Sequence, residues 1–462
     1  MKKFLIVILF VLASDGITYG QNSISYTIRG LENTRVYLSA VHGSRHDPVD
    51  SCFSVNGHIE FKNKTGLPAG VYRISFRDSL FTDIICNNEQ IVITNDINNL
   101  AGSISVVHSE ENKIYYEYWQ MSAEIHDSID QISTLGNALY EASNHKMNPA
   151  LDSLALKVYQ LSDKLDKYTL QLVSKSHGLY VGKLLKAFVT PNWYAYKKLP
   201  GAKIYKSKHE FLKEHFFDNV DFSDSTLLNS EVFYVLCNDY LSRFCEPESD
   251  SNYIAAVDFI LGKAQACPPV YNYILNLFIN TFEDTEWEGT FIHLVDEHLE
   301  KNTCASDGYD KNLSERSAAL KKLRPGNKAP EILLNDVAGK PVSLYSVKAR
   351  VTLLLFWSSE CEHCEDVLPQ IQQIYAGYHP LGLEVFAVSV DTDKNTWINA
   401  IKRQGTAWIN VSDLKGFTSP VVAAFDAYST PTFFLLDAEK NIISHPYSPK
   451  QMTEGLQKAF GK

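Results

Sequence analysis

Three patterns of hydrophobic and polar residues follow one another along the chain. The first covers residues 24–97, where short runs rich in β-branched and aromatic residues are separated by turn residues, as is typical of strands. Asn56-Gly57 lies between two such runs and favours a tight hairpin, because both turn positions require positive φ. A small antiparallel β-sandwich is therefore predicted over residues 21–104. Its strands are predicted at Ile24–Ile28, Val36–Val41, Phe53–Val55, His58–Phe61, Val71–Phe76, Ile84–Cys86 and Ile91–Ile93.

The second pattern is helical and predicts an all-α domain over residues 105–322. Apolar residues recur at steps of three and four between Ile114 and Leu139, and again between Leu151 and Leu172. The break between these stripes predicts two antiparallel helices. An intramolecular hairpin is favoured over a dimerising coiled coil, which would make the protein a homodimer. Further helices are predicted at Ser230–Phe244, Tyr253–Ala266 and Tyr271–Phe282.

The third pattern follows a linker at 324–330 and predicts an α/β domain over residues 323–462. Two continuous apolar runs are typical of strands buried on both faces, and each precedes a helical segment. A hairpin and a final helix complete the layers. The predicted elements are Val351–Phe356, Cys364–Tyr378, Leu383–Val390, Lys394–Gln404, Thr432–Leu436, Asn441–Ser444 and Gln451–Phe460.

The composition agrees with several folded domains. The chain has 462 residues, 45% of them hydrophobic and 21% charged, and this length exceeds what one ordinary core organises. The formal net charge is −11, and no run of five consecutive Lys and Arg residues occurs. A nucleic-acid partner is therefore not expected, because its binding requires a basic footprint.

The first 20 residues have the pattern of a cleaved signal peptide. A positive start at Met1–Lys3 precedes an apolar run from Phe4 to Ala13, which is only half the length of about 20 residues that a spanning helix needs. Small residues at Thr18 and Gly20 predict cleavage after Gly20. The mature protein is expected to be periplasmic, without a stable membrane anchor, in a compartment where cysteine pairs can oxidise.

The motif with the clearest chemical potential is a cysteine pair, Cys361-Glu362-His363-Cys364. It follows a buried strand at the predicted start of a helix, where a spacing of three residues brings both sulfurs to one face. The free N–H groups and positive dipole of a helix start favour a thiolate, which is the species that attacks disulfides. Cys361 is therefore the candidate nucleophile, and Cys364, one turn further in, is the candidate resolving thiol.

Charged neighbours of the motif act in opposite directions on the Cys361 thiolate. His363 could stabilise it, whereas Glu360 and Glu362 place negative charge nearby. Both directions of electron flow stay open on this basis. The chemistry needs no cofactor besides the cysteine pair itself.

Residues 325–462 resemble the TlpA/ResA group of thioredoxin-like proteins. The resemblance rests on Gly326-x-x-Ala329-Pro330, Asp336-x-x-Gly339-Lys340, Phe356-Trp357 before the cysteine motif, Pro369, and Thr430-Pro431. It implies a thioredoxin-like fold and a thiol–disulfide oxidoreductase in which Cys361 and Cys364 cycle between dithiol and disulfide. It also implies that Trp357, Thr430 and Pro431 contribute to substrate binding, with the substrate chain held as an added strand. A cis peptide is expected at Thr430-Pro431.

The sequence departs from that group at three positions. Leu355 stands where thioredoxin has a buried aspartate, Val367 where ResA-type proteins have a glutamate, and Glu360 where a tryptophan is frequent. The base that serves Cys364 is therefore open among Glu360, Glu362 and water. The expected partners are protein thiols and disulfides, and an envelope redox protein that resets the pair.

Other functions are conceivable for the same residues. Zinc lacks a fourth ligand beside Cys361, Cys364 and His363, and covalent haem lacks the histidine that Glu365 replaces, so no metal is expected. An envelope binding or scaffold protein with a structural thioredoxin-like domain is the main alternative. A weaker metal candidate joins His42, His46 and His58. The remaining cysteines could be buried free thiols or disulfides, namely Cys52, Cys86, Cys237, Cys245, Cys267 and Cys304.

Overall fold

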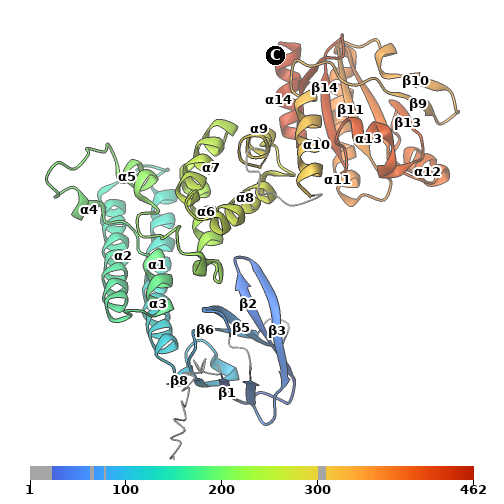
Figure 1. The fold of residues 1–462 in the computed structure, drawn as a ribbon. Helices are drawn as coiled ribbons and strands as arrows, with labels where there is room; N and C mark the ends of the chain where they lie inside the picture. Colours follow the sequence, from blue (N-terminus) through green and yellow to red (C-terminus); the bar gives the residue numbers. More distant parts are fainter. Residues whose placement is uncertain (1–22, 63–66, 78–79, 300–308, 462) are drawn as a thin grey trace, which may run out of the picture. The chain divides into compact units, whose positions relative to one another are not determined.

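The structure is a computed structural model that describes residues 23–62, 67–77, 80–299 and 309–461 (Figure 1). It divides into one unit of Met1–Glu246 with Asp258–Ile274, and a second of Pro247–Val257 with Leu275–Lys462. The predicted order of a β region, a helical region and an α/β domain is confirmed. The predicted signal peptide lies outside the described residues, and the boundaries after residues 104 and 322 stay predictions.

The β region is a sandwich of two four-stranded sheets. Their strand orders are β4-β1-β7-β8 and β3-β2-β5-β6, and residues of both contribute to one hydrophobic core. The expected turn at Asn56-Gly57 is confirmed by φ angles of 52° and 75°. The strands are β1 (Ser23–Arg29), β2 (Arg35–His42), β3 (Arg45–Phe53), β4 (His58–Lys62), β5 (Gly70–Arg77), β6 (Leu80–Cys86), β7 (Ile91–Asp96) and β8 (Ser105–His108).

The sandwich differs from the sequence prediction in one strand pairing and in two edge strands. The predicted antiparallel arrangement is wrong for β1 and β7, which pair in parallel. The sequence predicts a strand that begins at Phe53, but β3 begins eight residues earlier and ends at Phe53. The sequence gives no indication of β8. Both β3 and β8 lie at sheet edges. Most side chains of β3 are exposed, so burial imposes no alternation of apolar and polar residues on its sequence.

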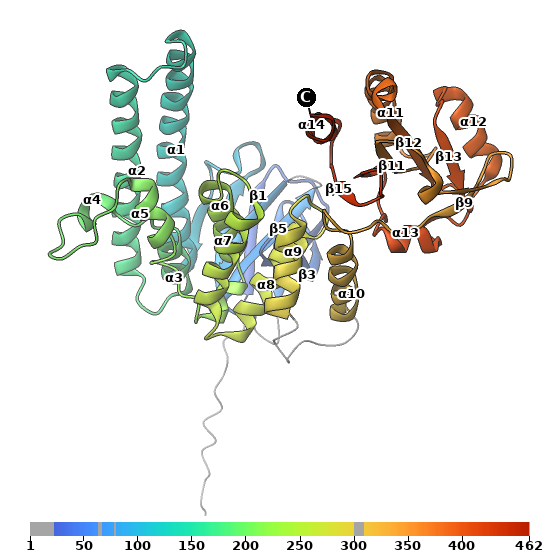
Figure 2. The ribbon, with the colours of Figure 1, turned by 90° about the horizontal axis from the view of Figure 1, so that it is seen from above.

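The predicted helical hairpin is confirmed. α1 (Glu110–Ala142) and α2 (Pro149–Lys175) run side by side in Figure 1 and Figure 2. Asn148 caps α2 by accepting hydrogen bonds from the N–H groups of Ala150 and Leu151, which fixes where the second helix begins. No helix in the described part of the chain has the length and apolar character needed to cross a bilayer. The homodimer stays a prediction.

Shorter helices follow the hairpin, and the three predicted near residues 230–282 are confirmed as α6 to α8, with ends shifted by a few residues. These helices are α3 (Tyr180–Ala187), α4 (Trp193–Tyr196), α5 (Lys208–His215), α6 (Val232–Phe244), α7 (Asp250–Ala264), α8 (Pro268–Phe282), α9 (Glu288–His293) and α10 (Tyr309–Lys322).

The C-terminal domain is built on a seven-stranded sheet of order β10-β9-β13-β12-β11-β14-β15. β11 pairs in parallel with β12 and antiparallel with β14, as expected for a thioredoxin-like fold. Its strands are β9 (Leu333–Asp336), β10 (Pro341–Ser343), β11 (Val351–Trp357), β12 (Leu383–Ser389), β13 (Ile409–Ser412), β14 (Thr432–Leu436) and β15 (Ile442–Ser444). Its helices are α11 (Glu362–Tyr378), α12 (Lys394–Gln404), α13 (Pro420–Ala424) and α14 (Pro449–Phe460).

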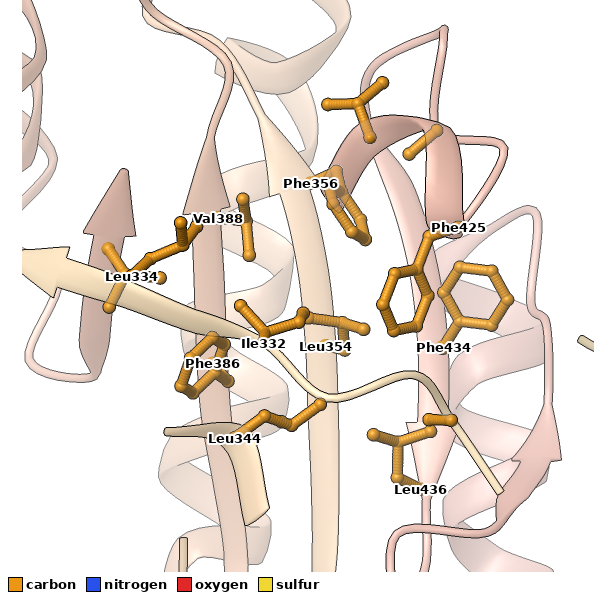
Figure 3. Packing of buried hydrophobic residues seen from close by; sticks show 14 of the residues in the cluster. Ile332, Leu334, Leu344, Leu354, Phe356, Phe386, Val388, Phe425, Phe434 and Leu436 are labelled. Carbon is orange, nitrogen blue, oxygen red and sulfur yellow. The ribbon is translucent and has the colours of Figure 1, made fainter. Parts of the chain in front are cut away.

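Separate hydrophobic cores cover the two faces of this sheet. One core joins the sheet to α11, α12 and α14. The other contains Phe356, Phe425 and Phe434, whose rings lie 5.4 Å apart in successive pairs beside α13 (Figure 3). Because all seven residues of β11 are buried, its end is a rigid support for the loop that follows it.

Candidate active site

Cys361 stands at the junction between β11 and α11. It is the N-cap residue of α11, and its Sγ accepts a hydrogen bond of 3.2 Å from the backbone N–H of Cys364. Backbone N–H groups at a helix start lack partners within the helix and carry partial positive charge. The sulfur of Cys361 is therefore placed where a thiolate is stabilised.

The two sulfurs of the motif have different environments. Cys361 is half-buried, and its Sγ donates a 3.2 Å hydrogen bond to the carbonyl oxygen of Thr430. Cys364 is only 1% exposed, and burial, followed by its hydrogen bond with Cys361, raises the pKa of its thiol to about 12. At neutral pH Cys364 is thus a protonated and sheltered thiol, whereas Cys361 is reachable from solvent.

The loop before β14 lies against the reactive sulfur. The expected cis peptide at Thr430-Pro431 is confirmed. The carbonyl of Thr430 reaches Cys361, and the Thr432 hydroxyl donates a 2.7 Å hydrogen bond to the carbonyl of Ser429, which closes the turn. The Thr430 end of this loop therefore lies directly beside Cys361 Sγ.

Trp357, which the resemblance implies as a substrate contact, is buried in the structure. Its ring is 2% exposed and packs in the core on the α11 side of the sheet, and its Nε1 has no hydrogen-bond partner among the described residues. A ring in that position offers a client almost no surface. Its contact with the core instead fixes the end of β11, one residue before the loop that leads to Cys361.

The charged residues beside the cysteines point to solvent. Glu360, Glu362 and His363 are exposed, and no hydrogen bond or ion pair between described residues joins them to either sulfur. Any influence that they have on the thiolate therefore acts through space, and their predicted tuning role stays a prediction.

The positions that carry acids in relatives are apolar here, as the sequence indicates. Leu355 is fully buried and Val367 packs against the same core as Cys364. This apolar environment explains why burial dominates the pKa shift of Cys364.

Asp391 is a buried carboxylate beside the active-site loop that the sequence analysis did not single out. It is 6% exposed, and its Oδ1 accepts hydrogen bonds from the Ser358 hydroxyl (2.9 Å) and from the N–H (2.9 Å) and hydroxyl (2.8 Å) of Ser359. The Ser389 hydroxyl donates to Oδ2 at 2.8 Å. Asp391 thereby holds the two residues that connect β11 to Glu360 and Cys361.

A signal for this residue does exist in the sequence. Asp391 follows the apolar run of β12, which pairs in parallel with β11, so both strands end at the same edge of the sheet. Carboxyl ends of neighbouring parallel strands bring their following residues together. Ser358 and Ser359 supply hydroxyls at that edge.

Replacing Asp391 with alanine is expected to lower the turnover number for disulfide reduction by up to about a hundredfold, because a displaced loop misplaces Cys361. Asparagine at 391 keeps an acceptor oxygen and should cost much less. Insulin reduction and urea unfolding measure activity and stability separately. Asp393→Ala is the matched control, because Asp393 caps α12 two residues away and is exposed. Equal activity of Asp391→Ala and Asp393→Ala would contradict the positioning role.

The other candidate residues do not assemble into a second site. The remaining described cysteines are thiols rather than disulfides, so Cys52 and Cys86 form no bridge, and Cys304 lies outside the described residues. His42 hydrogen-bonds to Asp47 and Asn229, whereas His58 bonds to Thr27. In the described ranges these histidines therefore have separate structural partners.

Comparison with known proteins agrees with the geometry of the C-terminal domain. Residues 325–445 match the model of the AhpC/TSA family. Thiol-disulfide oxidoreductase ResA of Bacillus subtilis (strain 168) is 29% identical over 126 residues, which is 27% of this chain and 69% of that protein. The C-terminal domain is TlpA/ResA-like. It is of the thiol–disulfide oxidoreductase type, and the fold class of the chain is multidomain as predicted.

Further matches include a second ResA and two that extend beyond the C-terminal domain. ResA of Bacillus anthracis is 26% identical over 143 residues, 30% of this chain and 81% of the relative. Residues 196–280 match a domain of unknown function (DUF5106). A thioredoxin-like protein from Bacteroides caccae is 21% identical, covers 59% of this chain and 99% of its own, and has a TM-score of 0.47.

Proposed function

We propose that this protein exchanges disulfides of client proteins in the periplasm, with Cys361 as nucleophile and Cys364 as resolving thiol. The observation that carries the proposal is the contrast between the two sulfurs. Cys361 is half-buried at a helix start, whereas Cys364 is buried with its pKa raised to about 12. Such a pair supports an ordered reaction in which only one thiol meets the client.

In the reductive direction, the Cys361 thiolate attacks one sulfur of a client disulfide. The client S–S bond breaks, a mixed disulfide forms at Cys361, and the departing client thiolate takes a proton from solvent. The Cys364 sulfur then gives up its proton and attacks Cys361 Sγ. The second client thiol leaves, so the client has gained two electrons and two protons, and Cys361 and Cys364 form a disulfide.

Resetting the pair requires a dithiol donor in the same compartment. That donor supplies two electrons and two protons by the same exchange chemistry, and it corresponds to the envelope redox partner expected from the sequence. The Thr430-Pro431 loop is proposed to hold the client chain, because the Thr430 carbonyl already lies 3.2 Å from Cys361 Sγ. Run backwards, the same steps oxidise a client.

Insulin reduction tests whether the domain is an enzyme or a structural module. With dithiothreitol as electron donor, the wild-type protein should precipitate insulin chains faster than dithiothreitol alone. A rate equal to that of dithiothreitol alone would favour the scaffold alternative.

Cell fractionation with intact mass measurement tests location, and we expect a periplasmic protein that begins at Gln21. Retention in the cytoplasm with Met1 present would contradict that part of the proposal.

A further inference from the structure

A pocket of about 170 Å³ lies in the first unit, where the second sheet of the sandwich meets α1, α3 and α6. Its wall is mainly apolar and aromatic, with carboxylates at Asp83 and Glu231. An apolar cavity of about 150 Å³ is large enough for a molecule the size of benzene. The pocket can therefore hold a small ligand. It is separate from the thiol chemistry, which belongs to the second unit.

Aromatic rings form the walls of this pocket. Tyr115 and Tyr118 both pack against Trp119, with ring centroids 6.0 Å and 5.5 Å apart and interplanar angles of 79° and 70°. Phe188 adds a fourth ring. Tyr115 is 7% exposed whereas Trp119 is 44% exposed, so one ring lies deep and the other at the rim. Several aromatic rings therefore border the same pocket.

One carboxylate of the pocket has no directly bonded partner among the described residues. Asp83 is neutralised by Arg73 through two hydrogen bonds of 2.7 Å, from Nε to Oδ1 and from Nη2 to Oδ2. Glu231 is half-buried, and within the described residues its carboxylate makes no hydrogen bond or ion pair. Burial raises the pKa of Glu231, the nearby charge of Asp83 adds to this shift, and the charge of Arg73 opposes it. A cation bound directly beside Glu231 would offset the cost of burying its charge.

We infer that this pocket binds a small organic cation, an alkylated ammonium group held by Tyr115, Tyr118 and Trp119 and paired with Glu231. The faces of aromatic rings attract such cations, most strongly where water is displaced. A neutral apolar ligand would leave the half-buried Glu231 charge without a direct partner, and an anion would be repelled by it. Alkyl groups on the nitrogen match the apolar wall, which a bare ammonium ion would not.

Calorimetric titration of the full-length protein with choline tests the inference. The neutral probe 3,3-dimethylbutan-1-ol has the same shape with carbon in place of nitrogen, so the pair isolates the charge. Choline should bind at one site per chain, at least about tenfold more tightly than the neutral probe. Equal affinity of the two probes, or no saturable binding of free choline, would overturn the inference.

Two variants assign the binding to this pocket. Glu231→Gln and Trp119→Leu should each weaken choline binding by about tenfold, since one removes the charge and the other a ring. Glu124→Gln is the matched control, because Glu124 is an exposed residue of α1 outside the pocket. Circular dichroism confirms that each variant is folded. Unchanged choline affinity in folded Glu231→Gln and Trp119→Leu would place the ligand elsewhere and contradict the assignment.

Discussion

Serine at position 361 is expected to abolish disulfide reduction, with a loss of kcat/KM of roughly a thousandfold or more. The reason is that the Cys364 thiol cannot replace the missing nucleophile. It is 1% exposed, and with a pKa of about 12 it holds almost no thiolate at neutral pH. Insulin reduction with dithiothreitol, corrected for the rate of dithiothreitol alone, measures the loss.

Cys52→Ser is the matched control for this substitution. Cys52 is a half-buried free thiol of β3, far along the sequence from the motif, so its replacement should leave the rate unchanged. If Cys361→Ser kept a substantial part of wild-type activity while Cys52→Ser lost it, the assignment of the nucleophile would be wrong.

Serine at position 364 is expected to trap the client on the enzyme. The half-buried Cys361 can still attack a disulfide, but no second sulfur is available to release the mixed disulfide. Oxidised insulin or envelope proteins should therefore remain attached to Cys361 in nearly stoichiometric amounts, while the wild type carries few adducts. Intact mass and non-reducing gels detect the adducts, which a reductant should remove.

The double variant Cys361→Ser, Cys364→Ser supplies the control for trapping. It lacks both sulfurs of the motif and should form no adduct, although the other cysteine thiols are still present. Adducts at equal level in the double variant would show that another cysteine reacts, and the resolving role of Cys364 would lose its support.

The sequence predicted those parts of the fold where burial is strong and regular. The apolar runs of β11 and β12 reflect strands covered on both faces. The stripes of α1 and α2 reflect the contact between the two helices of a hairpin, in which most stripe side chains are only half-buried. The predicted bounds of α12 and β14 agree with the structure residue for residue. Elements without such burial, above all the exposed edge strand β3, leave no comparable pattern.

The sequence predicts only part of the candidate site, because several of its contacts join segments that are far apart in the chain. Local sequence places Cys361 at a helix start, because the strand, the motif and the helix are contiguous. The contact with Thr430 and the hydrogen bonds of Asp391 join segments that lie 69 and up to 33 residues apart in the chain. The burial of Trp357 likewise depends on α11 and the sheet together, and a motif alone does not reveal it.

Alkylation of the folded, reduced protein tests the contrast between the two sulfurs most directly. Iodoacetamide reacts with thiolates, and peptide mass spectrometry assigns each modified cysteine. At pH 8 Cys361 should be modified rapidly and Cys364 hardly at all. The rate at Cys364 should rise about tenfold per pH unit towards its pKa of about 12, for as long as the fold persists. Modification of Cys364 as fast as Cys361 at neutral pH in the folded protein would contradict the account.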